Sequence, residues 1–267
     1  MKDQDTHSVT DEAYERYVTT KIGDVVQSNE ASLRRFAQTY AHYLRGWLPP
    51  AKNAAIVDAG CGHGNMLYAL RTWGYSNCMG IDRSPEQVAL ARRRFPATEQ
   101  GDATEFLDQR AADVDCIVAF DLLEHLSLED ALHFLKACHS ALRPEGRLLL
   151  QLPNGGAVRG GEVAWGDLTH HRAYSVSAVR QILKLAGFQD IAFRETGPVV
   201  LGLTSFVRRC LWQVARCCIL AYDLAEIGRA SGMVTRTMLV RSIKSAEVTS
   251  GANRVQTQRF ERNMGRE

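Results

Sequence analysis

Several features that mark particular classes of protein are missing from this sequence. No run of about 18 uninterrupted apolar residues occurs, so we expect no helix that spans a membrane. The seven cysteines are an odd number and form no Cys-x-x-Cys pair, which argues against a disulfide framework or a zinc knuckle. The segment 1–17 is polar and acidic, unlike a secretory signal. These absences together predict a cytoplasmic protein.

The net charge is also small, and no low-complexity block occurs in the sequence. The formal net charge is +2 and no concentrated basic face is visible, so we expect no nucleic-acid partner. The segment 245–267 is polar and without apolar periodicity, and we expect it to be disordered. The chain has 267 residues and 45% hydrophobic content, enough for one α/β domain with appendages.

The stretch VDAGCGHGNML, Val57–Leu67, organises the rest of the chain. An apolar run that ends at Asp58 predicts a buried strand, and the apolar residues that follow the glycines predict a helix. Three alternating glycines between them, Gly60, Gly62 and Gly64, let the backbone approach a ligand that a Cβ would exclude. The helix then presents unpaired N–H groups to that ligand.

Two acids indicate what kind of ligand this is. Asp58 would repel a pyrophosphate but suits a cationic group. Asp82 ends the apolar run 78–81, at the position where Rossmann-type sites bind ribose hydroxyls. With no phosphate-binding lysine beside them, the acids and glycines favour a positively charged nucleoside, S-adenosylmethionine (SAM).

Four segments, in this order, resemble the successive motifs of class I SAM-dependent methyltransferases: DAGCGHG, GIDRSPEQVALAR, GDATEF and LRPEGRLLLQLPN. The resemblance spans 54–193. It implies an α/β, Rossmann-like sheet of seven strands, mostly parallel with the last strand antiparallel, and helices on both faces. It also implies a SAM-binding core at 51–196 and a last core strand at 236–244. The helical segment at 1–50 is either a lid over the cofactor, as in related methyltransferases, or a helix that packs on the sheet edge. The segment 197–235 is a departure from the plain fold, and its apolar spacing predicts a helical insert.

Apolar runs give the elements of that sheet. We expect strands at 54–58, 77–81, 96–100, 114–120, 147–152, 188–196 and 236–244. Helical patterns lie at 11–48, 64–73, 85–94, 103–109, 128–142 and 176–186.

The resemblance also assigns roles to residues at the strand ends. It implies that Asp58 binds the methionine ammonium, that Asp82 binds both ribose hydroxyls, and that Asp102 and Ala103 face the adenine amine. The carbonyl of Phe120 would lie near the methionine end. The full set of expected cofactor contacts is Asp58, Gly60, Cys61, Gly62, Gly64, Asp82, Arg83, Asp102, Ala103 and Phe120.

Transfer of the methyl group to an alcohol also requires a base, and histidine is the usual one near neutral pH. Two histidine segments, DLLEHL and GDLTHHRAY, follow the fourth and fifth predicted strands on the cofactor side of the sheet. The candidates for the base are His170 first, then His125 and His171.

A metal-assisted reaction is the alternative for this region. Asp121, Glu124, His125 and His170 form a pattern similar to the acid-x-x-Glu-His…His ligands of metal-assisted O-methyltransferases, where Mg²⁺ lowers the pKa of the bound alcohol. Those families carry glutamate at the position of Asp121, and metal-free relatives share the Glu-His pair. We therefore favour the reaction without Mg²⁺.

The insert contains an apolar stripe at helical spacing beside Arg208, Arg209 and Arg216. One interpretation is an added helix pair that covers the substrate cleft or makes a homodimer contact. The other is an interfacial helix, 203–228, that rests on an anionic membrane at the inner face.

The segments GCGHG and WGDLTHHRAYS and the late insert are similar to bacterial methyltransferases of surface-polysaccharide assembly. This resemblance implies O-methylation of a sugar, or of a group on a nucleotide- or lipid-linked sugar, in polysaccharide or lipid-linked glycan biosynthesis. A quinone-ring O-methyltransferase is the alternative enzyme. A non-catalytic SAM- or nucleoside-binding regulatory protein is the alternative from another class.

Overall fold

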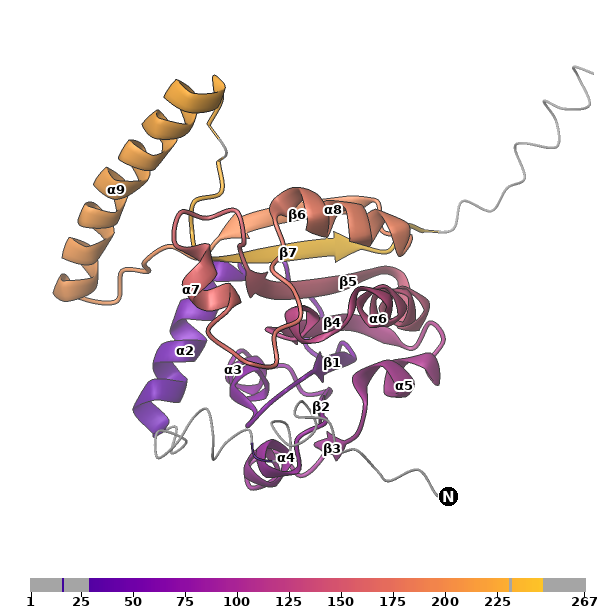
Figure 1. Cartoon of the computed structure of the whole chain (residues 1–267). Helices are drawn as coiled ribbons and strands as arrows, with labels where there is room; N and C mark the ends of the chain where they lie inside the picture. Colours follow the sequence, from indigo (N-terminus) through magenta and orange to yellow (C-terminus); the bar gives the residue numbers. More distant parts are fainter. Residues whose placement is uncertain (1–15, 17–28, 231, 247–267) are drawn as a thin grey trace, which may run out of the picture.

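A seven-stranded sheet with the order β3-β2-β1-β4-β5-β7-β6 forms the centre of the computed structural model, which describes residues 16, 29–230 and 232–246 (Figure 1). The strands are β1 Ile56–Ala59, β2 Cys78–Asp82, β3 Glu99–Gln100, β4 Val114–Phe120, β5 Leu142–Pro153, β6 Asp190–Glu195 and β7 Thr237–Ile243. The first five strands pair in parallel, and β7 runs antiparallel to both β5 and β6. This is the sheet that the sequence predicts.

Helices cover both faces of the sheet (Figure 1). They are α2 Glu30–Tyr43, α3 Asn65–Thr72, α4 Pro85–Arg92, α5 Ala103–Asp108, α6 Leu128–Ala141, α7 Gly160–Ala164, α8 Val176–Leu185 and α9 Leu203–Ile227, with a short 3₁₀ turn at Leu123–His125. Alternation along the strands divides the core in two, because successive side chains point to opposite faces. Val57 belongs to the same hydrophobic cluster as residues of α5, α6 and α8, whereas its neighbour Ile56 belongs to the cluster that contains residues of α2 and α3.

The turn between β2 and α4 agrees with the start of the helix that the sequence predicts. Ser84 caps α4 by accepting a hydrogen bond from the backbone N–H of Gln87 (3.4 Å), and Pro85 is the first helical residue. Serine at the cap and proline at the first position are the expected start of a helix. This start fixes the direction in which α4 leaves the tip of β2.

Three predicted elements differ from the structure. The third strand is reduced to Glu99–Gln100, because Pro96 and the turn closed by Thr98 occupy the start of the predicted run. The fifth strand begins at Leu142, five residues early, because Leu142 pairs with Val114 before 143–146 leave the ladder. The insert is one 25-residue helix, α9, and not a helix pair.

Part of the predicted helical lid, most of 1–28, lies outside the described residues, as does the predicted disordered tail beyond residue 246. Within the lid, α2 is present and packs on α3. Among the described residues, no helix combines the length and apolar character needed to cross a bilayer.

Candidate active site

The glycine loop turns β1 into α3 through three residues with positive φ. The backbone N–H groups of Gly60 and Cys61 both donate to the carbonyl of Ile81 on β2, at 2.8 and 3.0 Å. Gly64 is the N-cap of α3 with φ +90°, and a Cβ on it would lie 2.9 Å from the ring of Phe95. Glycine is therefore required at this position both by backbone conformation and by space.

Asp82 lies at the carboxyl end of β2 and hydrogen-bonds to the backbone of the glycine loop. Its Oδ2 accepts a hydrogen bond from the Gly62 N–H (2.8 Å) and its Oδ1 accepts one from the Ser84 N–H (2.9 Å). Burial raises the pKa of Asp82, and the two N–H donors act in the opposite direction. The carboxylate is thus held in one orientation beside the glycines.

Asp58, at the end of β1, is 2% exposed, and its Oδ2 has no hydrogen-bond partner in the described part of the chain. Burial, together with the nearby Asp82, raises the pKa of Asp58 to about 8. A buried carboxylate oxygen without a partner is unfavourable. A cationic ligand group that approaches this oxygen would supply the missing interaction, so the site fits the ammonium of SAM.

A cavity of about 880 Å³, including its open mouth, lies above these residues, within the roughly 300–1,000 Å³ of small-molecule sites. Its lining includes Gly60, Gly62, Asp82, Arg83, Asp102 and Ala103. A second hollow on the other side of the glycine loop is lined by residues including Asp58, Cys61 and Phe120. The two share Gly60, Gly62, Gln87 and Asp121, so together they form one groove across the loop.

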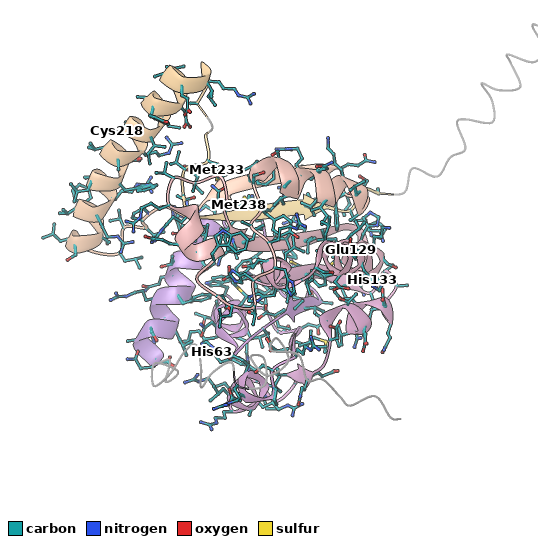
Figure 2. All side chains as sticks on the ribbon, viewed as in Figure 1. His63, Glu129, His133, Cys218, Met233 and Met238 are labelled. Atoms are coloured by element: carbon teal, nitrogen blue, oxygen red, sulfur yellow. The ribbon has the colours of Figure 1, made fainter. Side chains whose placement is uncertain are left out.

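Nine of the ten cofactor residues named from the sequence line this groove. Gly64 does not, and its place is at the start of α3. Asp102 also caps α5, where its Oδ1 accepts hydrogen bonds from the N–H groups of Thr104 (2.7 Å) and Glu105 (3.2 Å). His63 lies on the loop itself, with its Nδ1 3.2 Å from Oε1 of Gln87 (Figure 2).

The structure adds a polar chain at the Asp58 end of the groove that sequence reasoning missed. The Tyr40 hydroxyl of α2 donates to Oε1 of Gln151 (2.7 Å), whose Nε2 donates to Oδ2 of Asp121 (2.9 Å). Burial raises the pKa of Tyr40 far above its usual range, so the phenol keeps its proton and acts as a donor. Asp121 itself has a φ of +52°, an unusual backbone conformation for a residue other than glycine.

The two histidine segments meet beside the same groove, where His125 lines the cavity together with Asp121 and Leu122. The rings of His125 and His170 are 4.5 Å apart and nearly perpendicular. One ligand atom each from Glu124, His125 and His170 lie within 4.8 Å of one another. His171 is exposed, and its backbone N–H donates to the carbonyl of Glu124 (2.8 Å).

Three of the four residues suggested as metal ligands therefore come together. Asp121 is not part of this group, because its carboxylate accepts from Gln151 instead. Two imidazoles and one carboxylate suit a transition metal better than Mg²⁺, which prefers oxygen ligands. The cluster thus lacks the first acid of the pattern by which the magnesium alternative is suggested.

Comparison with known families decides the class of this protein. The family described as a methyltransferase domain matches residues 30–192. The chain belongs to this family. It carries a methyltransferase domain, and the relatives and solved structures that it resembles are described as SAM-dependent methyltransferases.

The similar proteins share a little under a third of their residues with this chain over the matched regions. A probable SAM-dependent methyltransferase of Mycolicibacterium smegmatis is 29% identical over 136 residues, covering 50% of this chain and 51% of the relative. A ubiquinone biosynthesis O-methyltransferase of Methylocella silvestris is 28% identical over 166 residues, covering 56% of this chain and 63% of the relative. The chain thus spans between half and two thirds of the length of these methyltransferases.

Solved structures support the fold. A SAM-dependent methyltransferase from Archaeoglobus fulgidus superposes with a TM-score of 0.58 at 19% identity, covering 78% of this chain and 94% of the other. A possible histamine N-methyltransferase from Thermotoga maritima gives a TM-score of 0.57 at 16% identity, covering 88% and 96%. At these identities the likeness concerns the fold alone.

Proposed function

We propose that this methyltransferase transfers the methyl group of SAM to a hydroxyl of a sugar, or of a group linked to a sugar, on a nucleotide- or lipid-linked glycan. The observation that carries the proposal is the setting of His125. It lines the cofactor cavity together with Gly60 and Asp82, so a base stands beside the methyl-donor site. An alcohol needs such a base, whereas many carbon and sulfur acceptors do not.

The hydrogen bonds of His125 orient it for this role. The Thr169 hydroxyl donates to Oδ1 of Asp167 (2.7 Å) and lies 2.8 Å from Nδ1 of His125. A hydroxyl has one proton, so Thr169 accepts from a protonated Nδ1. In the proposed reaction His125 then has its proton on Nδ1, and Nε2 is the nitrogen that takes the proton of the alcohol.

His170 supports His125 in this account. Its Nδ1 donates to the carbonyl of Ala164 (2.8 Å), its side chain is 6% exposed, and it does not line the cofactor cavity. We therefore place His125 ahead of His170 as the base, with His170 as the packing partner that holds the His125 ring. His171 is the last candidate for the base, because it is exposed and contacts Glu124 through its backbone N–H.

The remaining groups position the reactants. SAM, when bound, supplies a methyl group on a positively charged sulfur. Asp82 would hold the ribose, Asp58 the ammonium, and α2 would form a lid through Phe36 and Tyr40, which line the groove beside Asp58. Holding an acceptor in line can contribute roughly 7–11 kcal/mol to lowering the barrier.

Methylation of a quinone-ring hydroxyl is the second candidate. The similarity to ubiquinone biosynthesis O-methyltransferases favours it, and a phenolic hydroxyl could use the same base. A regulatory protein that binds SAM without catalysis is the third, and the ordered histidine cluster argues against it.

The experiment is a transfer assay with labelled SAM and three acceptor sets: nucleotide-linked sugars, lipid-linked glycans and quinols. We expect label in a sugar acceptor, and at least a 100-fold lower kcat for His125→Gln with unchanged affinity for S-adenosylhomocysteine. His133→Gln, an exposed histidine that pairs with Asp108, is the matched control and keeps full activity. Label in the quinols alone would favour the second candidate, and tight binding without transfer to any set would favour the third.

A further inference from the structure

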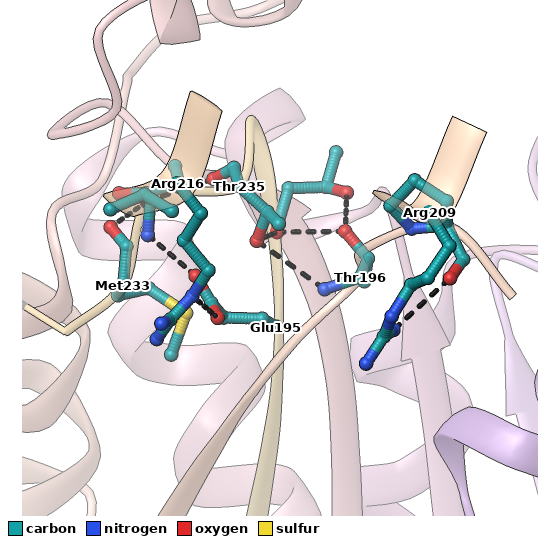
Figure 3. Close-up of polar contacts among 10 residues, drawn as sticks. Glu195, Thr196, Arg209, Arg216, Met233 and Thr235 are labelled. Atoms are coloured by element: carbon teal, nitrogen blue, oxygen red, sulfur yellow. Dashed lines mark hydrogen bonds and ion pairs between the residues drawn. The ribbon is translucent and has the colours of Figure 1, made fainter. Parts of the chain in front are cut away.

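Helix α9 contacts the protein through a mixed polar and apolar face and turns an apolar face outward. Arg216 pairs with Glu195 through Nε and Oε2 at 3.0 Å, and Arg209 donates to the carbonyl of Pro198 at 3.1 Å (Figure 3). The Trp212 ring lies against Gly197. None of the 25 residues of α9 is buried. The half-buried residues of α9 form a mixed polar and apolar face: Ser205, Arg209, Trp212, Arg216, Ile219, Leu220 and Asp223. The more continuous apolar face is therefore not the one that meets the body, unlike the usual arrangement of a surface helix.

The outward face is apolar along the whole helix. Its large side chains are between 50% and 80% exposed: Leu203, Phe206, Val207, Leu211, Val214 and Leu224. The three exposed cysteines of the described chain, Cys210, Cys217 and Cys218, lie between them, and α9 stands away from the sheet (Figure 2). Contiguous apolar surface of this kind marks an interaction site.

The width of the apolar face distinguishes between occupants. At 100° per residue it covers roughly 140° of the helix circumference, and no charged residue of α9 lies within it. A two-helix seam is a narrow stripe, commonly flanked by charged residues. Pairing with a second helix would leave much of this face exposed to water, whereas a lipid surface would cover all of it.

The charges of α9 indicate the type of lipid. Arg208, Arg209 and Arg216 all lie in the N-terminal two thirds of the helix, where there is no acidic residue. Arg208 is exposed at the border of the apolar face. Arg209 and Arg216 contact the body, and the acidic residues of α9, Asp223 and Glu226, lie in its last turns, so Arg208 is the charged residue that borders the apolar face over most of its length. A cationic residue at the border of an apolar face is a feature of helices that lie in the headgroup region of anionic membranes.

We propose that α9 docks this protein on an anionic membrane surface, with the outward face of the helix immersed among the lipids and the sheet on the aqueous side. The proposal does not depend on which acceptor is methylated. It has a consequence for access: α7 and α9 border a common hollow lined by Val163 and Trp212, so docking brings the segment that leads to His170 close to the lipid surface.

The test is flotation of the full chain with vesicles of phosphatidylglycerol and phosphatidylcholine. We expect the protein to float with them, to bind pure phosphatidylcholine vesicles less, and to lose at least tenfold in partition on Leu211→Glu. The matched control is Leu185→Glu on α8, which places the same charge at a leucine of similar exposure, 63% against 66%, and keeps full binding. Both variants retain wild-type affinity for S-adenosylhomocysteine, which separates this result from any failure of the cofactor site.

Three results would overturn the proposal: a wild-type chain that stays unbound, a Leu211→Glu variant that floats like the wild type, or equal binding to neutral vesicles. A dimer in lipid-free light scattering that Leu211→Glu converts to a monomer, without vesicle binding, would instead make α9 a seam between two copies. A fluorophore on Cys217, with Cys210 and Cys218 changed to serine, gives a second readout. Its emission should shift to the blue in anionic vesicles.

Discussion

Among single residues, Asp58 carries the clearest mark of the cofactor. Its carboxyl is buried, one oxygen has no hydrogen-bond partner in the described residues, and its pKa is raised to about 8. The Asp58 carboxyl holds its proton more tightly in the folded chain than in the unfolded chain, where its pKa is 3.8. The folded state therefore loses stability as the pH rises from 3.8 toward 8. The residue therefore destabilises the empty protein at neutral pH, and we attribute its presence to ligand binding.

Asp58→Asn tests this assignment. At pH 8 we expect the ligand-free variant to melt a few degrees higher than the wild type, since about 1 kcal/mol corresponds to roughly 2–4 °C at this size. Affinity for S-adenosylhomocysteine should fall at least tenfold. In the wild type, binding should tighten as pH rises toward 8, because the ionised carboxyl binds the ammonium, and the variant should lose most of this dependence. A lower melting temperature with unchanged affinity would make Asp58 a structural residue.

Metal removal tests the histidine cluster. Because Asp121 is held by Gln151 and the remaining donors are two imidazoles and one carboxylate, we expect EDTA to leave the transfer rate within about twofold, with no gain from added Mg²⁺. Restoration of a lost rate by zinc or manganese would show that Glu124, His125 and His170 hold a metal, and would remove His125 as the base.

At the scale of elements, local signals were sufficient for the strands, helix starts and glycine loop. Ser84-Pro85 set the start of α4, and the three glycines set the turn from β1 to α3. Contacts between distant segments could not be read from the sequence. The hydroxyl of Tyr40 meets Gln151, 111 positions away, and in the sequence Tyr40 shows only as one member of an apolar helical pattern.

The same limit applies to the acceptor side. The pairing of His125 with Thr169 across 44 positions underlies our proposal that His125 precedes His170 as the base. The sequence ranks His170 first, and no local signal in it reveals that hydrogen bond. The orientation of α9 was also hidden, since an apolar stripe at helical spacing does not show whether it faces the core or the solvent.

Gly64 and Gly74 make a matched pair for testing the glycine loop. Both have a φ near +90°, but a Cβ on Gly64 meets Phe95 at 2.9 Å, whereas a Cβ on Gly74 meets nothing within 4 Å. We expect Gly74→Ala to lower the free energy of unfolding by about 1–2 kcal/mol, from backbone conformation alone. Gly64→Ala should lose more and should also weaken S-adenosylhomocysteine binding. Equal losses in denaturant titrations would contradict the close approach at Gly64.

At the scale of the whole molecule, the proposed binding sites are distributed over successive segments of the chain. The carboxyl ends of β1 and β2 supply Asp58 and Asp82, as expected for parallel sheets that bind ligands at this edge. The segment after β5 carries His170 and His171. Helix α9 lies wholly outside the region that matches the methyltransferase family, which ends at residue 192. The proposed cofactor, acceptor and lipid contacts are thus supplied by successive parts of the chain.

The central claim is that the groove across the glycine loop binds SAM through carboxylates at two strand ends. Titration calorimetry of S-adenosylhomocysteine into the wild type, Asp82→Ala and the exposed control Asp113→Ala tests it most directly. We predict a one-to-one binding isotherm for the wild type and the control, and at least a 50-fold weaker one for Asp82→Ala with its fold intact by circular dichroism. Wild-type affinity in Asp82→Ala, or no binding heat in the wild type, would contradict the account.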